Sequence, residues 1–223
     1  MPNKISKKLI NIPLAGIELE GMLNIPDDAR AIVIFVHGSG SSRLSPRENF
    51  VAGELNQAGF ATLLFDLLTA EEDQTYANRF DLPLLKTRIE AVTAWIKKQK
   101  ETGELPIGYF GGSTGATAAL LAAADLGEEI KAVVSRGGRP DLAIDFLDLV
   151  KAPTLLIVGG NDFGVIELNE QAYAKLKTTK ELSIVPGATH LFEEPGKLEE
   201  VARRATAWFK KYLAVEPASR LAQ

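Results

Sequence analysis

The chain has 223 residues, of which 46% are hydrophobic and 24% charged, enough material for one sizeable globular core. Its formal net charge of −4 offers no basic surface to a phosphate backbone, so we expect no nucleic-acid partner. Cysteine is absent and there are only two histidines, which excludes disulfides, a thiolate nucleophile and thiolate metal ligands. We therefore expect no metal site and no cofactor.

The N-terminal segment is polar, and no apolar run approaches the length of a membrane span. These features lead us to expect a cytoplasmic protein without a membrane partner, either a monomer or a small homo-oligomer. No repeat, low-complexity tract or linker interrupts the chain. The prediction is one domain over residues 1–223, with a polar tail at about residues 214–223.

The predicted elements begin with an N-terminal β-hairpin at about residues 8–25, and strands then alternate with helices. Apolar runs predict the further strands, at about residues 31–36, 60–65, 107–110, 132–135, 154–158 and 181–185. Helical spacing and capping residues predict the helices, at about residues 45–58, 81–100, 114–126, 142–149, 166–177 and 195–213. Residues 66–80 have no clear period and are expected to form a surface loop that helps to roof a site.

This alternation favours an α/β fold, with a mostly parallel central sheet and helices on both faces. No segment is long enough for a large cap domain. In such sheets functional groups gather where the parallel strands end. The conspicuous loops do follow predicted strands, and they contain His37-Gly38, Ser113, Asp162 and His190.

The most informative stretch is residues 107–126, where an apolar segment runs into Gly-Gly-Ser-Thr-Gly and then into an alanine-rich helix. A serine nucleophile must stand on a sharp strand-to-helix turn, which needs neighbours without bulk, and Gly111 and Gly115 supply them. The pattern predicts Ser113 as the nucleophile and the N–H of Thr114 as a donor to an oxyanion. The alternative is that these five residues form only a flexible loop.

A serine hydroxyl needs a general base near neutral pH, and an imidazole base needs a carboxylate to orient it. His190 follows the last predicted strand and is the predicted base, whereas His37 is expected to brace its loop through hydrogen bonds to the backbone. Asp162 is the predicted acid, with a turn residue or helix cap as the alternative. The order Ser113, Asp162, His190 is the order that accompanies a nucleophile elbow.

The sequence offers few candidates for substrate binding. An arginine can bind a substrate carboxylate through two parallel hydrogen bonds, and Arg136 and Arg139 follow a predicted strand. The alternative is that they brace their own loop. His37, at the end of its strand, is a third candidate contact.

Together these motifs resemble the serine members of the α/β-hydrolase superfamily, nearest to the dienelactone-hydrolase-like family. The resemblance covers nearly the whole chain and rests on four segments: His37-Gly38-Ser39-Gly40, Gly111-Gly112-Ser113-Thr114-Gly115, Gly159-Gly160-Asn161-Asp162 and Gly187-Ala188-Thr189-His190-Leu191-Phe192. It implies a catalytic triad of Ser113, Asp162 and His190. It also implies an oxyanion hole formed by the N–H of Thr114 and an N–H after His-Gly, assigned to Ser39.

Dienelactone hydrolases proper carry cysteine within G-x-C-x-G, and this chain has none. The resemblance therefore implies a general carboxylesterase that cleaves small carboxylic esters or lactones through an acyl-enzyme. A thioesterase or peptidase with the same triad stays open. A non-catalytic ligand-binding protein on the hydrolase fold is the alternative from a different functional class.

Overall fold

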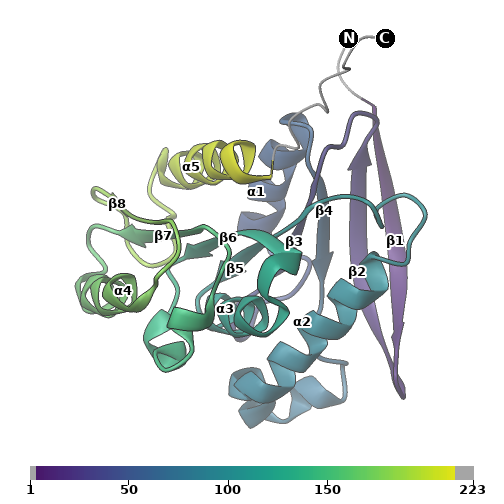
Figure 1. The fold of residues 1–223 in the computed structure, drawn as a ribbon, viewed down its shortest axis with the longest axis horizontal. Coiled ribbons are helices and arrows are strands. Elements are labelled where there is room, and N and C mark those ends of the chain that lie inside the picture. The colour runs from purple at the N-terminus through teal and green to yellow at the C-terminus, as the bar shows by residue number, and fades with distance from the viewer. Residues whose placement is uncertain (1–3, 214–223) are drawn as a thin grey trace.

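The computed structural model describes residues 4–213, in which eight strands form one sheet with helices on both faces (Figure 1). The strands are β1 (Ile5–Leu14), β2 (Ile17–Pro26), β3 (Ile32–Val36), β4 (Ala61–Phe65), β5 (Ile107–Gly112), β6 (Ile130–Arg136), β7 (Thr154–Gly159) and β8 (Lys180–Val185). Their order across the sheet is β1-β2-β4-β3-β5-β6-β7-β8. The hairpin β1–β2 pairs antiparallel and joins β4 antiparallel, whereas β4 through β8 run parallel.

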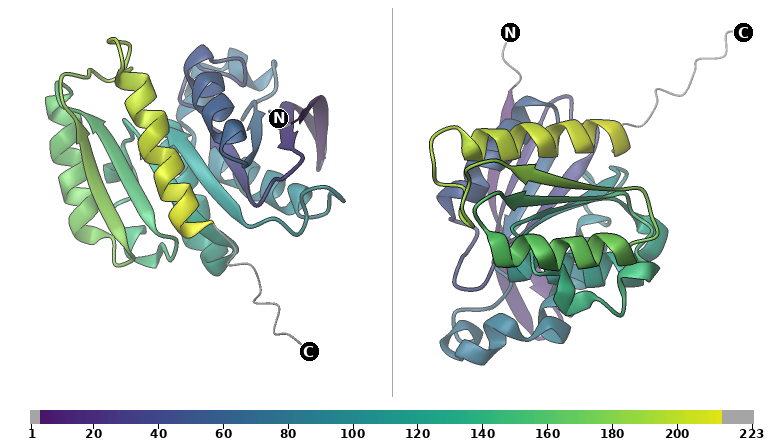
Figure 2. Two further views of the ribbon diagram at one scale, coloured as in Figure 1. Left: turned by 90° about the horizontal axis from the view of Figure 1, so that it is seen from above. Right: turned by 90° about the vertical axis from the view of Figure 1, so that its left-hand side faces the viewer.

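Five α-helices pack on this sheet, two on one face and three on the other (Figure 2). They are α1 (Pro46–Gln57) and α5 (Lys197–Tyr212) on the first face, and α2 (Leu82–Ile96), α3 (Thr114–Leu126) and α4 (Phe163–Lys175) on the second. In β3, alternate residues enter the two separate hydrophobic cores. This is why the strand is a continuous apolar run rather than an alternating one.

The mostly parallel sheet between two helical layers confirms the predicted fold class. The N-terminal hairpin is also present, and its turn places Gly16 at a φ of +82°. The polar tail predicted at 214–223 lies outside the described residues, and the assignment of one domain to residues 1–223 stays a prediction. Among the described residues, no helix combines the length and the apolar character needed to cross a membrane.

Several predicted helices have different limits or a different form in the structure. Helix α4, predicted at about residues 166–177, spans Phe163–Lys175. The segment expected to be helical at 142–149 consists of two 3₁₀ turns, η4 (Pro140–Ala143) and η5 (Leu147–Leu149), because so short a stretch does not propagate a continuous α-helix. Helix α2 ends at Ile96, whose carbonyl accepts a hydrogen bond from the Thr102 hydroxyl. Helix α5 begins after Gly196, whose left-handed backbone at a φ of +79° prevents an earlier start.

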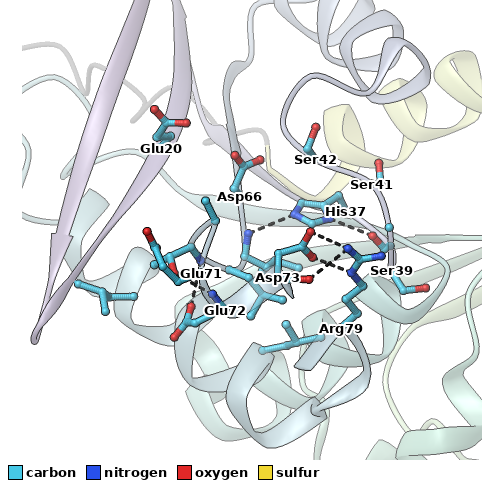
Figure 3. Close-up of a pocket in the computed structure, with 18 of the residues that line it drawn as sticks. Glu20, His37, Ser39, Ser41, Ser42, Asp66, Glu71, Glu72, Asp73 and Arg79 are labelled. Carbon is cyan, nitrogen blue, oxygen red and sulfur yellow. Dashed lines mark hydrogen bonds and ion pairs between the residues drawn. The ribbon is translucent and has the colours of Figure 1, made fainter. Parts of the chain in front are cut away.

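The segment between β4 and α2 is more ordered than the predicted loop. It contains two 3₁₀ turns, η1 (Glu72–Gln74) and η2 (Tyr76–Phe80). Ion pairs fix it to itself and to α2, since Arg79 binds Asp73 and Arg88 binds Glu72. It lies beside the loop that follows β3 and forms one wall of a cavity (Figure 3).

Candidate active site

Ser113 stands on the turn between β5 and α3 in a strained backbone conformation. Its φ is 50° and its ψ −124°, a region that residues other than glycine rarely adopt. Its N–H donates to the carbonyl of Arg136 at 3.1 Å, which ties the turn to the end of β6. Such strain persists only where the surrounding structure holds it, and it is concentrated at functional sites.

The glycines on either side of Ser113 are required for close packing. A Cβ at Gly115 would overlap the carbonyl oxygens of Val36 and His37, and a Cβ at Gly111 would overlap the backbone of Ala116. The start of α3 is thereby pressed against the end of β3. The prediction that both positions must lack bulk is confirmed.

Asp162 and His190 come from neighbouring loops, and their side chains are in contact. The Nδ1 atom of His190 lies 2.7 Å from Oδ2 of Asp162. Asp162 occupies the N-cap position of α4, yet its side chain makes no capping hydrogen bond. The carboxylate is thus directed to the imidazole rather than to the helix, unlike the helix cap that was the alternative.

The backbone holds these two loops together. The N–H of Gly160 donates to the carbonyl of Val185 at 2.8 Å, and the N–H of Asn161 donates to Ala188 at 2.9 Å. Both bonds join the end of β7 to the loop that carries His190. The position of the imidazole relative to Asp162 is therefore set by main-chain contacts.

The end of β6 brings the histidine close to the serine turn. A Cβ at Gly137, which has a φ of +54°, would lie 3.4 Å from both Nδ1 and Cε1 of His190. Gly137 directly follows Arg136, whose carbonyl accepts the N–H of Ser113. Because Asp162 engages Nδ1 of His190, Nε2 is the imidazole nitrogen that Asp162 leaves unengaged.

His37 braces the loop after β3, as the sequence predicts. The N–H of Leu67 donates to Nε2 of His37 at 3.1 Å, and Nδ1 of His37 lies 2.9 Å from the carbonyl of Gly38. Because Nε2 accepts a hydrogen bond, Nδ1 carries the proton and donates to Gly38. The ring joins the loop after β3 to the segment after β4.

The N–H of Ser39, expected to be free for an oxyanion, has a partner in this structure. It donates to Oγ1 of Thr114 at 2.9 Å. The loop after β3 packs tightly on the serine turn, since a Cβ at Gly38 would lie 3.1 Å from Cβ of Ser113. This packing turns the amide of Ser39 toward the first residue of α3.

The N–H of Thr114 belongs to the first turn of α3, where a helix leaves its amides unsatisfied. Within residues 4–213 this N–H makes no hydrogen bond. This amide thus has the freedom that an oxyanion donor requires.

Arg136 and Arg139, the candidate carboxylate binders, both face carboxylates of the chain. Arg139 makes two hydrogen bonds to Asp141, at 2.9 and 2.8 Å, which raise the pKa of Arg139. Arg136 is buried, and its Nη2 lies 3.6 Å from Oε1 of Glu48. Burial lowers the pKa of Arg136 and raises the pKa of Glu48. Substrate binding by these arginines stays a prediction.

Glu48 is a residue whose place at the site the sequence did not reveal. Its position three residues after Ser45 is typical of a capping box, which gives it a local role at the start of α1. In the structure the Ser45 hydroxyl accepts the N–H of Glu48, but the carboxylate of Glu48 turns to Arg136 beside Gly112. Gly112 leaves the space, since a Cβ there would lie 2.7 Å from Nη2 of Arg136.

A cavity of about 690 Å³ adjoins the site on the side of the loop after β3 (Figure 3). Its walls come from this loop, from the tip of the β1–β2 hairpin and from the segment after β4. His37, Gly38 and Ser39 line it, whereas the three triad candidates do not. Its lining includes six carboxylate residues: Glu18, Glu20, Asp66, Glu71, Glu72 and Asp73. In the part of the chain that is described, no group of three or more potential ligands is suited to a metal ion.

The sheet order, the strained serine turn and the loops after β7 and β8 together define an α/β-hydrolase fold. The chain belongs to the dienelactone hydrolase family, whose model matches residues 19–214. The family and the fold support hydrolase activity.

Two solved structures illustrate the likeness. A dienelactone hydrolase from Anabaena variabilis is 52% identical and superposes with a TM-score of 0.92, over 94% of this chain and 99% of that one. Est1E from Butyrivibrio proteoclasticus is 22% identical, with a TM-score of 0.79 over 91% of this chain and 98% of its own, and shows the fold alone.

A curated relative has a different name. A Mycobacterium tuberculosis protein named "Putative phosphoribosyl transferase" is 56% identical over 204 residues, which are 92% of this chain and 46% of that protein. The chain therefore spans about half the length of the curated relatives that it matches.

Proposed function

We propose that this protein is a serine hydrolase that cleaves small carboxylic esters or lactones through a covalent acyl-enzyme. The observation that carries the proposal is the 2.7 Å contact between His190 and Asp162, at the end of the sheet where Ser113 is held in a strained turn. In this proposal Ser113 is the nucleophile, His190 the general base and Asp162 the carboxylate that orients the base.

In the proposed reaction the hydroxyl oxygen of Ser113 attacks the ester carbonyl carbon while Nε2 of His190 takes the hydroxyl proton. Asp162 holds the imidazole in the required tautomer and stabilises the imidazolium. The carbonyl oxygen becomes an oxyanion beside the N–H of Thr114. Collapse expels the alcohol, which receives the proton from His190, and water then releases the acid by the same steps in reverse.

The name of the M. tuberculosis relative suggests phosphoribosyl transfer as another activity. The match covers 46% of that protein, and its name does not say whether the transferase activity belongs to the matched part. A thioesterase or peptidase would use the same three residues, so substrate tests must separate these classes. A non-catalytic binding protein would have no use for both a strained serine turn and an imidazole oriented by a carboxylate.

The test is hydrolysis of p-nitrophenyl esters, from acetate to octanoate, by the native protein and by Ser113→Ala. We expect the variant to lose several orders of magnitude in kcat/KM, because the nucleophile is removed. The chain-length profile of the native protein would measure the size of the acyl site. Activity that survives Ser113→Ala would overturn the assignment.

If neither protein hydrolyses these esters, labelling with a fluorophosphonate separates the remaining cases. Labelling of the native protein at Ser113 would show an activated serine with a different acyl substrate. Failure to label would favour the binding-protein alternative.

A further inference from the structure

The hydroxyl of Thr114, the residue after Ser113, is a hydrogen-bond acceptor in this structure. It accepts the N–H of Ser39 at 2.9 Å, the donor expected to point at an oxyanion. A threonine hydroxyl keeps one proton to donate while it accepts. Within the described residues no acceptor takes that proton, and none takes the N–H of Thr114. Two donors of one residue, next to Ser113, are therefore free.

We propose that Thr114 supplies both donors of the oxyanion hole, its backbone N–H and its side-chain O–H. This inference rests on the proposed function and adds a catalytic side chain to it. Ser39 then acts through Thr114: its N–H orients the hydroxyl and polarises it, and does not itself touch the substrate. A hydroxyl that accepts one hydrogen bond donates the next one more strongly.

Packing fixes this hydroxyl before a substrate arrives. Thr114 is only 8% exposed and opens α3, so its backbone is held by the helix and by the contact between Gly115 and the end of β3. Its branched Cβ restricts rotation about χ1, and the bond from Ser39 selects one rotamer. Donors fixed in advance stabilise a developing charge without reorganisation during the reaction.

The step balances without transfer of a proton from Thr114. When Oγ of Ser113 bonds to the carbonyl carbon, the π electron pair moves to the carbonyl oxygen and the serine proton moves to Nε2 of His190. The oxyanion accepts hydrogen bonds from the N–H and the O–H of Thr114. Both bonds are strongest when the oxygen is fully charged, so they favour the transition state over the bound ester.

A second arrangement would give the hydroxyl the opposite effect. Oγ1 of Thr114 would occupy the place of the substrate oxygen and would have to rotate away to release the N–H of Ser39. Removal of the hydroxyl would then leave the rate unchanged or raise it. The two arrangements therefore differ in the sign of one measurable change.

The test compares Thr114→Val, which keeps the shape without the hydroxyl, with Thr114→Ser, which keeps the hydroxyl. We expect Thr114→Val to lower kcat by about 10²–10³-fold, the usual effect of losing one oxyanion donor, with little change in KM. Thr114→Ser should keep kcat within about tenfold of the native value, because it retains both donors. Native or faster turnover by Thr114→Val, or equal losses in both variants, would overturn the proposal.

The affinity for a transition-state analogue tests whether the Thr114 hydroxyl contacts the oxyanion, because a purely structural role of Thr114 would leave this affinity unchanged. A trifluoromethyl ketone forms an oxyanion with Ser113, so its affinity should fall in Thr114→Val in proportion to kcat/KM. Thermal unfolding of each variant checks the fold. If Thr114→Val does not fold, Thr114→Ala in the same inhibition assay replaces it, and unchanged affinity there would overturn the proposal.

The activity of Ser113→Ala distinguishes failure of the Thr114 proposal from failure of the proposed serine hydrolase function. Loss of activity in Ser113→Ala together with full activity in Thr114→Val would remove the role of Thr114 and leave the serine hydrolase intact. Retained activity in Ser113→Ala would remove the proposed function itself.

Discussion

Backbone strain gathers near the candidate site. In residues 4–213 positive φ outside glycine occurs at Ser113 and at Phe192, two residues after His190. Phe192 is buried in the core beneath α5, which supplies the packing that holds its backbone at a φ of 56°. The loops that carry the serine and the histidine are therefore both fixed by contacts outside the site.

Gly115 illustrates the packing requirement, and Gly115→Ala tests it. A Cβ there would overlap two backbone carbonyls, which have no room to move, so we expect a loss of about 3 kcal/mol in the free energy of unfolding. Gly53→Ala is the matched control, because Gly53 lies in α1 with nothing near the added methyl group. The control should gain about 0.5–1 kcal/mol. Equal effects in urea denaturation would contradict the packing argument.

Asp162→Asn tests the contact with His190. The amide keeps the shape of the side chain but cannot stabilise the imidazolium, so kcat should fall by about 10⁴-fold with the fold retained. Asp141→Asn is the control, since its partner is Arg139 rather than a triad residue. A rate near native for Asp162→Asn would leave Asp162 as a turn residue only.

Between elements, a buried ion pair joins α1 to the end of β6. Glu48 and Arg136 have side chains only 4% and 7% exposed, and they meet beside Gly112. Such a pair adds little net stability, but removal of one partner leaves an uncompensated buried charge. The pair therefore holds α1 in place relative to the serine turn.

A double-mutant cycle measures this coupling. Glu48→Gln should destabilise the protein by about 3–5 kcal/mol because it leaves the Arg136 cation unpaired. Glu48→Gln combined with Arg136→Met should be markedly less destabilised than the sum of the single changes. Additive losses in chemical denaturation would mean that the two side chains do not interact.

On α5, Glu200 provides a prediction about pH. Hydrogen bonds from Arg203 and then Arg204 hold the pKa of Glu200 at about 2, below its ordinary value of 4.5. Since the folded pKa is the lower one, this stabilisation is fully present above pH 4.5 and is lost as the pH falls toward 2. The stability difference between native protein and Glu200→Gln should shrink over that window. A constant difference from pH 6 to pH 2 would contradict the assignment.

In the whole molecule, the antiparallel β1–β2 hairpin extends the parallel part of the sheet and contributes to the cavity. The β1–β2 pair extends the sheet past β4, and its tip forms one wall of the acidic cavity next to Ser39. The net charge of the chain is itself negative. Four of the cavity carboxylates are paired with arginines, and the salt bridges of the described residues include no cation partner for Glu18 or Glu71. We therefore expect a substrate of the proposed site to meet a local negative potential from these two residues.

This charge predicts a preference among esters. An ester with an anionic alcohol portion should show a lower kcat/KM than its neutral analogue at low ionic strength, and added salt should narrow the gap. Glu71→Gln, in the cavity wall, should also reduce the difference in kcat/KM between the two esters. Glu54→Gln, on α1 outside that lining, should leave this difference unchanged. Equal kcat/KM values for the two esters at every salt concentration would place the substrate away from the cavity.

The sequence alone determined the alternation of strands and helices, the buried character of the parallel strands, and three candidate residues at strand ends. These features are local, because hydrophobic periodicity and turn-forming residues can be recognised from neighbouring positions in the sequence. The chain order of the three candidates, Ser113, Asp162 and His190, is likewise visible in the sequence. The exact helix limits were less predictable, since the end of α2 has a hydrogen bond from Thr102 and the start of α5 follows the left-handed Gly196.

The contacts among these residues depend on the tertiary structure. It directed the carboxylate of Asp162 to His190 rather than to the start of α4, paired Glu48 with Arg136, and gave the N–H of Ser39 to Thr114. Each of these contacts joins segments far apart in the chain, and each depends on the exact approach of one backbone to another. Local sequence patterns do not predict such distances, because the distances depend on how the helices and strands pack against one another.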